Sequence, residues 1–101
     1  MSMSDDIGLL NQASLEIGEV VGIIETASQG LDAAQNKILN ILQTVAAVRG
    51  DLNSPTLANY STSLRDALEE IRRAHNAHLE AIISLNKGNE LGREYANRLH
   101  G

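Results

Sequence analysis

The stretch that decides the fold is residues 10–48, which read LNQASLEIGEVVGIIETASQGLDAAQNKILNILQTVAAV. Apolar side chains recur there on an unbroken seven-residue repeat. One row, the Leu10 row, consists of Leu10, Ile17, Ile24, Leu31, Ile38 and Val45. The row three residues further on, the Ala13 row, consists of Ala13, Val20, Ala27, Ala34, Ile41 and Val48. Neither row contains a polar residue, and this pattern predicts a long helix whose seam lies against another helix.

The same repeat continues in the second half of the chain. The Leu57 row consists of Leu57, Leu64, Ile71, His78 and Leu85, with Gly92 and Leu99 further on. The row three residues further on, the Tyr60 row, consists of Tyr60, Ala67, Ala74, Ala81, Gly88 and Tyr95. Small residues in facing rows allow two helix backbones to approach closely. The four rows together predict an all-α fold, a long antiparallel helical hairpin of coiled-coil type.

Local signals place the ends of the predicted elements. A cation followed by glycine, Arg49-Gly50, is a usual helix stop, and Ser54-Pro55 is a usual helix start. We therefore expect one domain over residues 1–101, with helix one at about 5–49, a turn at 50–54 and helix two at about 55–86. The run Asn86-Lys87-Gly88-Asn89 predicts a helix break or kink. A C-terminal helical segment at about 89–99 is expected to follow it.

The composition disfavours several classes of function. The chain has a net charge of −5, which repels nucleic-acid phosphates and anionic membrane surfaces. It has no Cys, no Trp, no Phe and only two Tyr, a poor set for a thiolate metal site or an aromatic-lined pocket. The start is acidic and unlike a signal peptide, and no uninterrupted apolar stretch is long enough to span a bilayer. We expect a chain made in the cytoplasm, without cofactors or an integral membrane segment, which leaves the cell only by a route that needs no cleaved signal.

Apolar and small residues beside the predicted seam indicate a partner. An amphipathic helix with surplus apolar faces calls for a second copy, giving a four-helix bundle, or for a different hairpin. Gly18 and Gly22 form a smooth strip, which fits either a solvated face that tolerates glycine or a close approach by another helix. The predicted interface consists of Gly18, Val21, Gly22, Ile23, Leu42, Leu68, Ile82 and Ile83.

Catalysis and metal binding find little support in the sequence. His75 and His78 are spaced to share a metal ion, but no further ligands are evident, so we predict no metal site. His78 is interpreted as a histidine of the seam. No nucleophile in a recognisable turn and no phosphate-binding glycine loop is present, so the chain is predicted not to be an enzyme.

The layout resembles the WXG family of type VII secretion proteins and their actinobacterial relatives, small chains that fold as helical hairpins with a mid-chain turn. Val48-Arg49-Gly50 stands in the place of the Trp-x-Gly turn, of which the glycine matches. Tyr95 stands in the place of the export-signal tyrosine, with Leu99 where that signal has an acidic residue.

This resemblance implies a non-enzymatic protein that pairs with itself or with a helical partner, such as the N-terminal helices of a larger effector. It would be a secreted substrate or the adaptor of such an effector. The alternative is a structural or regulatory coiled-coil homodimer that stays in the cytoplasm.

Overall fold

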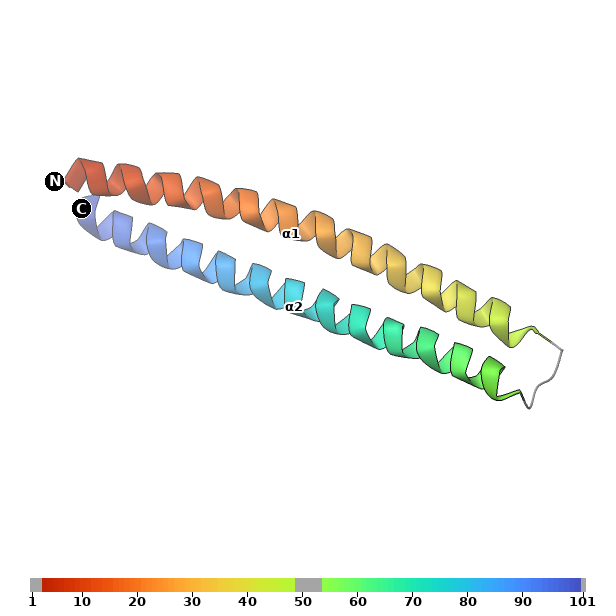
Figure 1. Ribbon diagram of the computed structural model, residues 1–101. Coiled ribbons are helices and arrows are strands. Elements are labelled where there is room, and N and C mark those ends of the chain that lie inside the picture. Colours follow the sequence, from red (N-terminus) through yellow and green to blue (C-terminus); the bar gives the residue numbers. More distant parts are fainter. Residues whose placement is uncertain (1–2, 49–53, 101) are drawn as a thin grey trace. The chain divides into compact units, whose positions relative to one another are not determined.

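The computed structural model describes residues 3–48 and 54–100, apart from the side chain of His100. Helix α1 spans Met3–Ala46 and helix α2 spans Pro55–His100 (Figure 1). The two helices pack against each other as a hairpin, and the described residues form no strand. The predicted fold class, an all-α helical hairpin, is therefore confirmed.

The helix ends follow local capping chemistry. The carbonyl oxygen of Ser54 accepts the first hydrogen bond of α2 from the backbone N–H of Ala58, at 3.1 Å, so Ser54 caps the helix and Pro55 begins it. At the end of α1 the N–H of Val48 bonds to the carbonyl of Val45 at 3.0 Å, which tightens the last turn. Helix α1 ends at Ala46, before the predicted 49, and the predicted turn falls outside the described residues except for Ser54.

Helix α2 runs without interruption through residues 86–89, so the predicted break there is wrong. Gly88 costs about 1 kcal/mol of helix stability relative to alanine. It nevertheless keeps a helical backbone, since no glycine in the described residues has a positive φ. Asn89 contributes to the contact between the helices, since its side chain accepts a hydrogen bond from Ser14. Packing against a neighbouring helix outweighs local propensity of this size.

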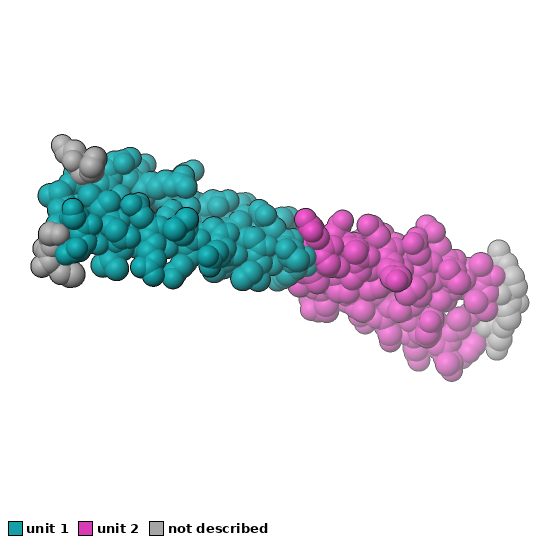
Figure 2. Space-filling view, turned by 90° about the horizontal axis from the view of Figure 1, so that it is seen from above, with its two compact units in different colours: residues 1–27, 78–101 teal, residues 28–77 magenta. Residues whose placement is uncertain are grey.

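The chain divides into two compact units, coloured teal and magenta in Figure 2. Unit 1 is formed by residues 1–27 and 78–101, the first part of α1 and the last part of α2. Unit 2 is formed by residues 28–77, the last part of α1 and the first part of α2. Within each unit the two helical segments run antiparallel and side by side (Figure 1). Each unit contains a part of α1 and a part of α2. The prediction of a single domain over residues 1–101 stays a prediction.

The seam between the helices contains only half of the predicted rows. The Leu10 row is half-buried throughout, as is the Leu57 row, His78 included. The Ala13 row is exposed except for Ala34, and the Tyr60 row is exposed except for Ala74 and Ala81, which are half-buried. The rows four residues on are covered instead. On α1 the Ser14 row consists of Ser14, Val21, Ser28, Gln35 and Leu42; on α2 the Ser61 row consists of Ser61, Leu68, His75, Ile82, Asn89 and Ala96.

Side-chain size explains the choice of row on α2. Helix axes pack about 8–10 Å apart, a space that Leu and Ile fill and Ala leaves open. Among the described residues the buried large apolar side chain is Leu68 of the Ser61 row, at 5% exposure, beside Ala67 of the Tyr60 row. Burying such a side chain contributes about 1.5–3 kcal/mol, well above the contribution of an alanine methyl group. On α1 size does not distinguish the two rows, because the Ser14 row carries Val21 and Leu42 and the Ala13 row carries Val20 and Ile41.

Candidate protein-binding surface

Four of the residues predicted to contact a partner belong to the seam instead. Val21 and Leu42 lie in the Ser14 row, and Leu68 and Ile82 lie in the Ser61 row. Leu68 is buried, and the other three are half-buried inside the hairpin. Their placement beside the seam was wrong because the prediction assigned the Ala13 and Tyr60 rows to the seam, whereas contact of these residues with a partner stays a prediction.

The other four predicted contact residues are exposed. Ile23 is 70% exposed and Ile83 is 69% exposed, and both belong to unit 1. A Cβ atom added at Gly18 or Gly22 would meet nothing within 4 Å. The packing inside unit 1 therefore does not require these two glycines, and the two readings of the glycine strip both remain open.

The most uniform exposed surface of unit 1 is formed by residues that sequence reasoning placed in the seam. Because the two helices are antiparallel, residues at the same heptad position lie on the same side of the seam. The Ala13 and Tyr60 rows thus share one side of unit 1, which we call the apolar edge. It consists of Ala13, Val20, Ala27, Ala81, Gly88 and Tyr95.

A groove lies on this side. Asp6, Leu9 and Leu10 of α1 line it together with Tyr95 of α2. Along the apolar edge itself Tyr95 is 54% exposed and Val20 is 43% exposed. From Ala13 onward the edge residues carry no charge, whereas Asp6 continues the Ala13 row toward the N-terminus and Glu16 lies four residues before Val20.

Large apolar side chains also flank the apolar edge. Leu9 and Ile23 share one heptad position on α1, three or four residues away from members of the Ala13 row. Leu91 occupies the same heptad position on α2. They are 57%, 70% and 52% exposed. Glu16 occupies the same heptad position between Leu9 and Ile23, so these apolar side chains flank the edge singly.

The opposite side of unit 1 is mixed in character. A second groove there is lined by Asn11, Ser14, Gly18, Asn89 and Arg93, with Leu15 at its rim. Leu15 is 73% exposed, so this side combines polar groups with exposed apolar surface.

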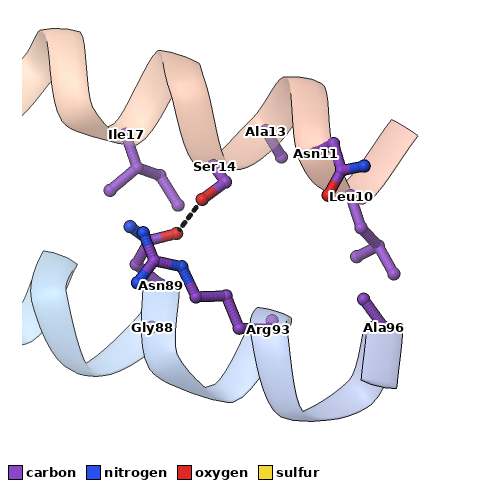
Figure 3. A pocket seen from close by; sticks show the side chains of 10 residues that line it. Leu10, Asn11, Ala13, Ser14, Ile17, Gly88, Asn89, Arg93 and Ala96 are labelled. Carbon is purple, nitrogen blue, oxygen red and sulfur yellow. Dashed lines mark hydrogen bonds between the residues drawn. The ribbon is translucent and has the colours of Figure 1, made fainter. Parts of the chain in front are cut away.

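Between the two sides, the seam of unit 1 is incompletely filled. A cavity of about 50 Å³ is lined by Leu10, Ala13, Ile17 and Gly92 among others. Ser14 and Asn89 face each other beside it, and Ser14 Oγ donates a hydrogen bond of 2.5 Å to Asn89 Oδ1 (Figure 3). This bond joins the two helices and satisfies two part-buried polar groups at once.

Unit 2 has an apolar side of the same origin but different flanks. Its part of the two rows consists of Ala34, Ile41, Val48, Tyr60, Ala67 and Ala74. Val48 and Tyr60 line one groove, as expected for rows on a common side. The outer surface of unit 2 carries ion pairs, Arg73–Glu70 at 2.7 Å and Arg73–Glu69 at 3.8 Å. Large apolar flanking residues such as those of unit 1 are fewer here.

The two histidines whose spacing could allow a shared metal ion both lie in seam rows. His78 is half-buried, as predicted for a seam histidine, and its Nδ1 atom has no hydrogen-bond partner. His75 is also half-buried, in the Ser61 row. Among the residues that the structure describes, no three His, Asp or Glu side chains gather in a group that could hold a metal ion.

Helix α1 is the described helix that is long and apolar enough to cross a membrane by length and composition. Its most apolar window has a mean hydropathy of 1.3, and none of that window is buried. A single helix near the N-terminus is weak evidence, because the core helix of a soluble protein or a signal sequence passes the same test. The finding agrees with an α1 that exposes more apolar surface than the hairpin covers.

Comparison of the chain with models of protein families, with curated proteins and with solved structures gives no match. The candidate surface therefore rests on the geometry of the hairpin alone.

Proposed function

We propose that this protein is a helix-pairing protein, which binds another helical chain through the apolar edge of unit 1. The observation that carries the proposal is the apolar edge, whose residues carry no charge and which the hairpin leaves exposed except at the half-buried Ala81. Helix-in-groove recognition uses a surface of this kind, with apolar residues on a helical repeat. We propose no catalytic role for the chain.

The test uses two lysine variants of the full chain in the cells that encode it. Val20→Lys places a charge on the apolar edge, and Glu16 four residues earlier supports the new lysine within α1. Leu15→Lys is the matched control, since Leu15 is 73% exposed and lies off the edge. Native mass spectrometry of the tagged chain should show a stoichiometric complex for the wild type and the control, and its loss for Val20→Lys.

A contradictory result is equally clear. If the wild-type chain and both variants are recovered only as free monomers with the same helicity, the apolar edge binds nothing and the proposal fails.

We further propose that the pairing serves type VII secretion, with the chain as a substrate or as the adaptor of an effector. What supports this is the hairpin fold together with Tyr95, which is 54% exposed and is available to a receptor. The alternative proposal is a cytoplasmic coiled-coil homodimer without a link to secretion. Deleting the secretion ATPase should abolish the appearance of the chain in the culture medium, and Tyr95→Ala should reduce it. An unchanged amount in the medium, or none in the wild type, would favour the alternative.

A further inference from the structure

The hydrogen bond that joins the helices of unit 1 lies between two polar residues in rows that are otherwise apolar there. Ser14 Oγ donates this bond of 2.5 Å to Asn89 Oδ1 (Figure 3). We propose that the Ser14–Asn89 pair fixes the register of the two helices in unit 1, which means that it decides which residue of α1 faces which residue of α2. This inference goes beyond the proposed function and is independent of any partner.

The Leu10 and Leu57 rows do not fix the register by themselves. Both repeat every seven residues, so sliding one helix along the other by one heptad, about 10.5 Å, places row against row again. The Leu10 row consists of Leu, Ile and Val throughout, and the Leu57 row consists of Leu and Ile except at His78 and Gly92. At most positions a slip therefore replaces one apolar neighbour by another.

The Ser14 and Ser61 rows distinguish the registers within unit 1. In antiparallel helices each step of seven residues along α1 corresponds to a step of seven residues back along α2. Counted from the hydrogen bond, and with Ile7 continuing the Ser14 row toward the N-terminus, the pairs in unit 1 are Ile7–Ala96, Ser14–Asn89 and Val21–Ile82. All of these residues are half-buried. The observed register thus places a polar pair between two apolar pairs.

A slip of one heptad in either direction breaks this match. In one direction Ser14 comes to face Ile82. Asn89 then faces Ile7, whereas it faces Val21 after a slip in the other direction. A covered polar group without a hydrogen-bond partner is costly, so each mismatched polar group should lower the population of a slipped register by about 10-fold.

Unit 2 does not select the register in this way. Val45 and Leu57 line the same grooves, which aligns the two helices there. The pairs of the Ser14 and Ser61 rows in unit 2 are then Ser28–His75, Gln35–Leu68 and Leu42–Ser61. The last two of these pairs set a polar residue against an apolar one, and the buried Ser28 Oγ has no hydrogen-bond partner among the described residues. The matching that favours one register therefore lies in unit 1.

Pulsed electron spin resonance between two spin labels measures the register directly. The chain has no cysteine, so Ser4→Cys and Asn86→Cys provide one labelling site on each helix. Both positions are exposed and lie in unit 1. A slip that brings residue 82 opposite Ser14 shortens the axial separation of the labels by about 10.5 Å, and the opposite slip lengthens it by the same amount. The labelled full chain, diluted with unlabelled chain, should show one distance with the natural seam.

The decisive variant exchanges two residues of α2. Ile82→Asn with Asn89→Ile keeps the composition and moves the polar group by one heptad. Ser14 then finds a polar partner in this row only after the slip that brings residue 82 opposite to it. We expect the main distance between the labels to shorten by up to about 10 Å, with unchanged helicity in circular dichroism.

A second variant removes the polar pair without supplying another. Ser14→Val with Asn89→Leu leaves apolar residues at both positions in every register, so slipped molecules should reach at least about one tenth of the population and appear as a second distance. Ser84→Val with Asn97→Leu is the matched control, because it makes the same two changes at exposed positions of unit 1. The control should keep the single distance.

Two results would overturn the inference. One is an exchanged chain that stays helical and keeps the distance of the natural seam. The other is a single unchanged distance in Ser14→Val with Asn89→Leu, and this variant alone decides if the exchange unfolds α2. Either result would assign the choice of register to the Leu10 and Leu57 rows.

Discussion

Units 1 and 2 are made from the same two helices and the same seven-residue repeat, yet they expose different surfaces. Unit 1 exposes large apolar residues beside its apolar edge, with Leu9, Ile23 and Leu91 each more than half exposed. Unit 2 carries the buried large apolar side chain of the described residues, Leu68, and an outer face with ion pairs to Arg73. A repeat that is uniform in the sequence thus yields two units whose exposed apolar side chains differ.

The largest expected effect concerns the seam of unit 2. Leu68→Ala should lower the free energy of unfolding by about 2–5 kcal/mol, toward the lower value because two helices can partly close over the vacated space. Ile83→Ala in unit 1 should change it by no more than about 0.5 kcal/mol, since Ile83 is 69% exposed. Urea denaturation at one fixed protein concentration measures both. Equal losses would mean that the seam is wrongly assigned.

The second prediction compares the two ends of the Ala13 row. Val20→Lys and Ile41→Lys place the same charge at the same heptad position, one in each unit. Val20→Lys should weaken association at least about 30-fold, and Ile41→Lys no more than about 5-fold, because fewer large apolar residues flank unit 2. Sedimentation equilibrium decides between them. A larger loss from Ile41→Lys would move the binding surface to unit 2.

The third prediction concerns the hydrogen bond that joins the helices of unit 1. Ser14→Ala should cost about 1–2 kcal/mol, because it leaves the part-buried Asn89 side chain without its donor. Asn89→Ala should cost a similar amount, because it leaves the Ser14 hydroxyl without its acceptor. The double variant should cost less than the two single losses together, with a coupling energy of about 1 kcal/mol in thermal denaturation. Strict additivity would show that the bond contributes nothing to the fold.

The fourth prediction sharpens the contrast in packing. Gly92→Ala should stabilise unit 1 by about 1–1.5 kcal/mol, because it adds helix propensity and places a methyl group in the cavity between the helices. Gly30→Ala in unit 2 should gain only the propensity of about 1 kcal/mol or less, since Gly30 is exposed. Each kcal/mol raises the melting temperature by about 4–8 °C in a domain of this size. A loss of stability at Gly92 would show that the helices need to approach closely there.

The smallest expected effect belongs to the outer face of unit 2. Arg73→Ala removes two exposed ion pairs and should cost no more than about 0.5 kcal/mol. The loss should disappear in high salt, because exposed charges are screened. Denaturation curves at low and at molar ionic strength measure it. A loss that persists in high salt would indicate that the Arg73 side chain contributes packing instead of charge.

Residue patterns alone predicted the class of fold because helix propensity, repeat length and capping are local. The Leu10 row, the Ser54 cap and Pro55 at the start of α2 all lie where the pattern placed them. The second row of the seam could not be read in the same way. Ala13 and Ser14 are neighbours, and either can flank Leu10 on a helix. Polarity favoured Ala13, and the two rows of α1 carry apolar side chains of similar size, so neither property identifies the covered row of this helix.

The candidate surface was therefore predicted in part and for the wrong reason. Ile23 and Ile83 were expected to be exposed and are exposed, but Val21, Leu42, Leu68 and Ile82 lie inside the seam. The apolar edge was visible in the sequence as a row without polar residues. In the structure the Ser14 row is covered and the Ala13 row is left outside, apart from Ala34. The apolar row is therefore open to a partner instead of forming the seam.

Taken by itself, the sequence determined two long antiparallel helices, because the seven-residue repeat and the signals at residues 54 and 55 act over short distances along the chain. Only the tertiary structure decided which rows face each other, that α2 continues through Gly88, and that the row of Ala13, Val20 and Ala27 is left outside. The physical reason is that a seam between two helices is chosen by how well opposing side chains fill it, and that fit depends on both helices at once.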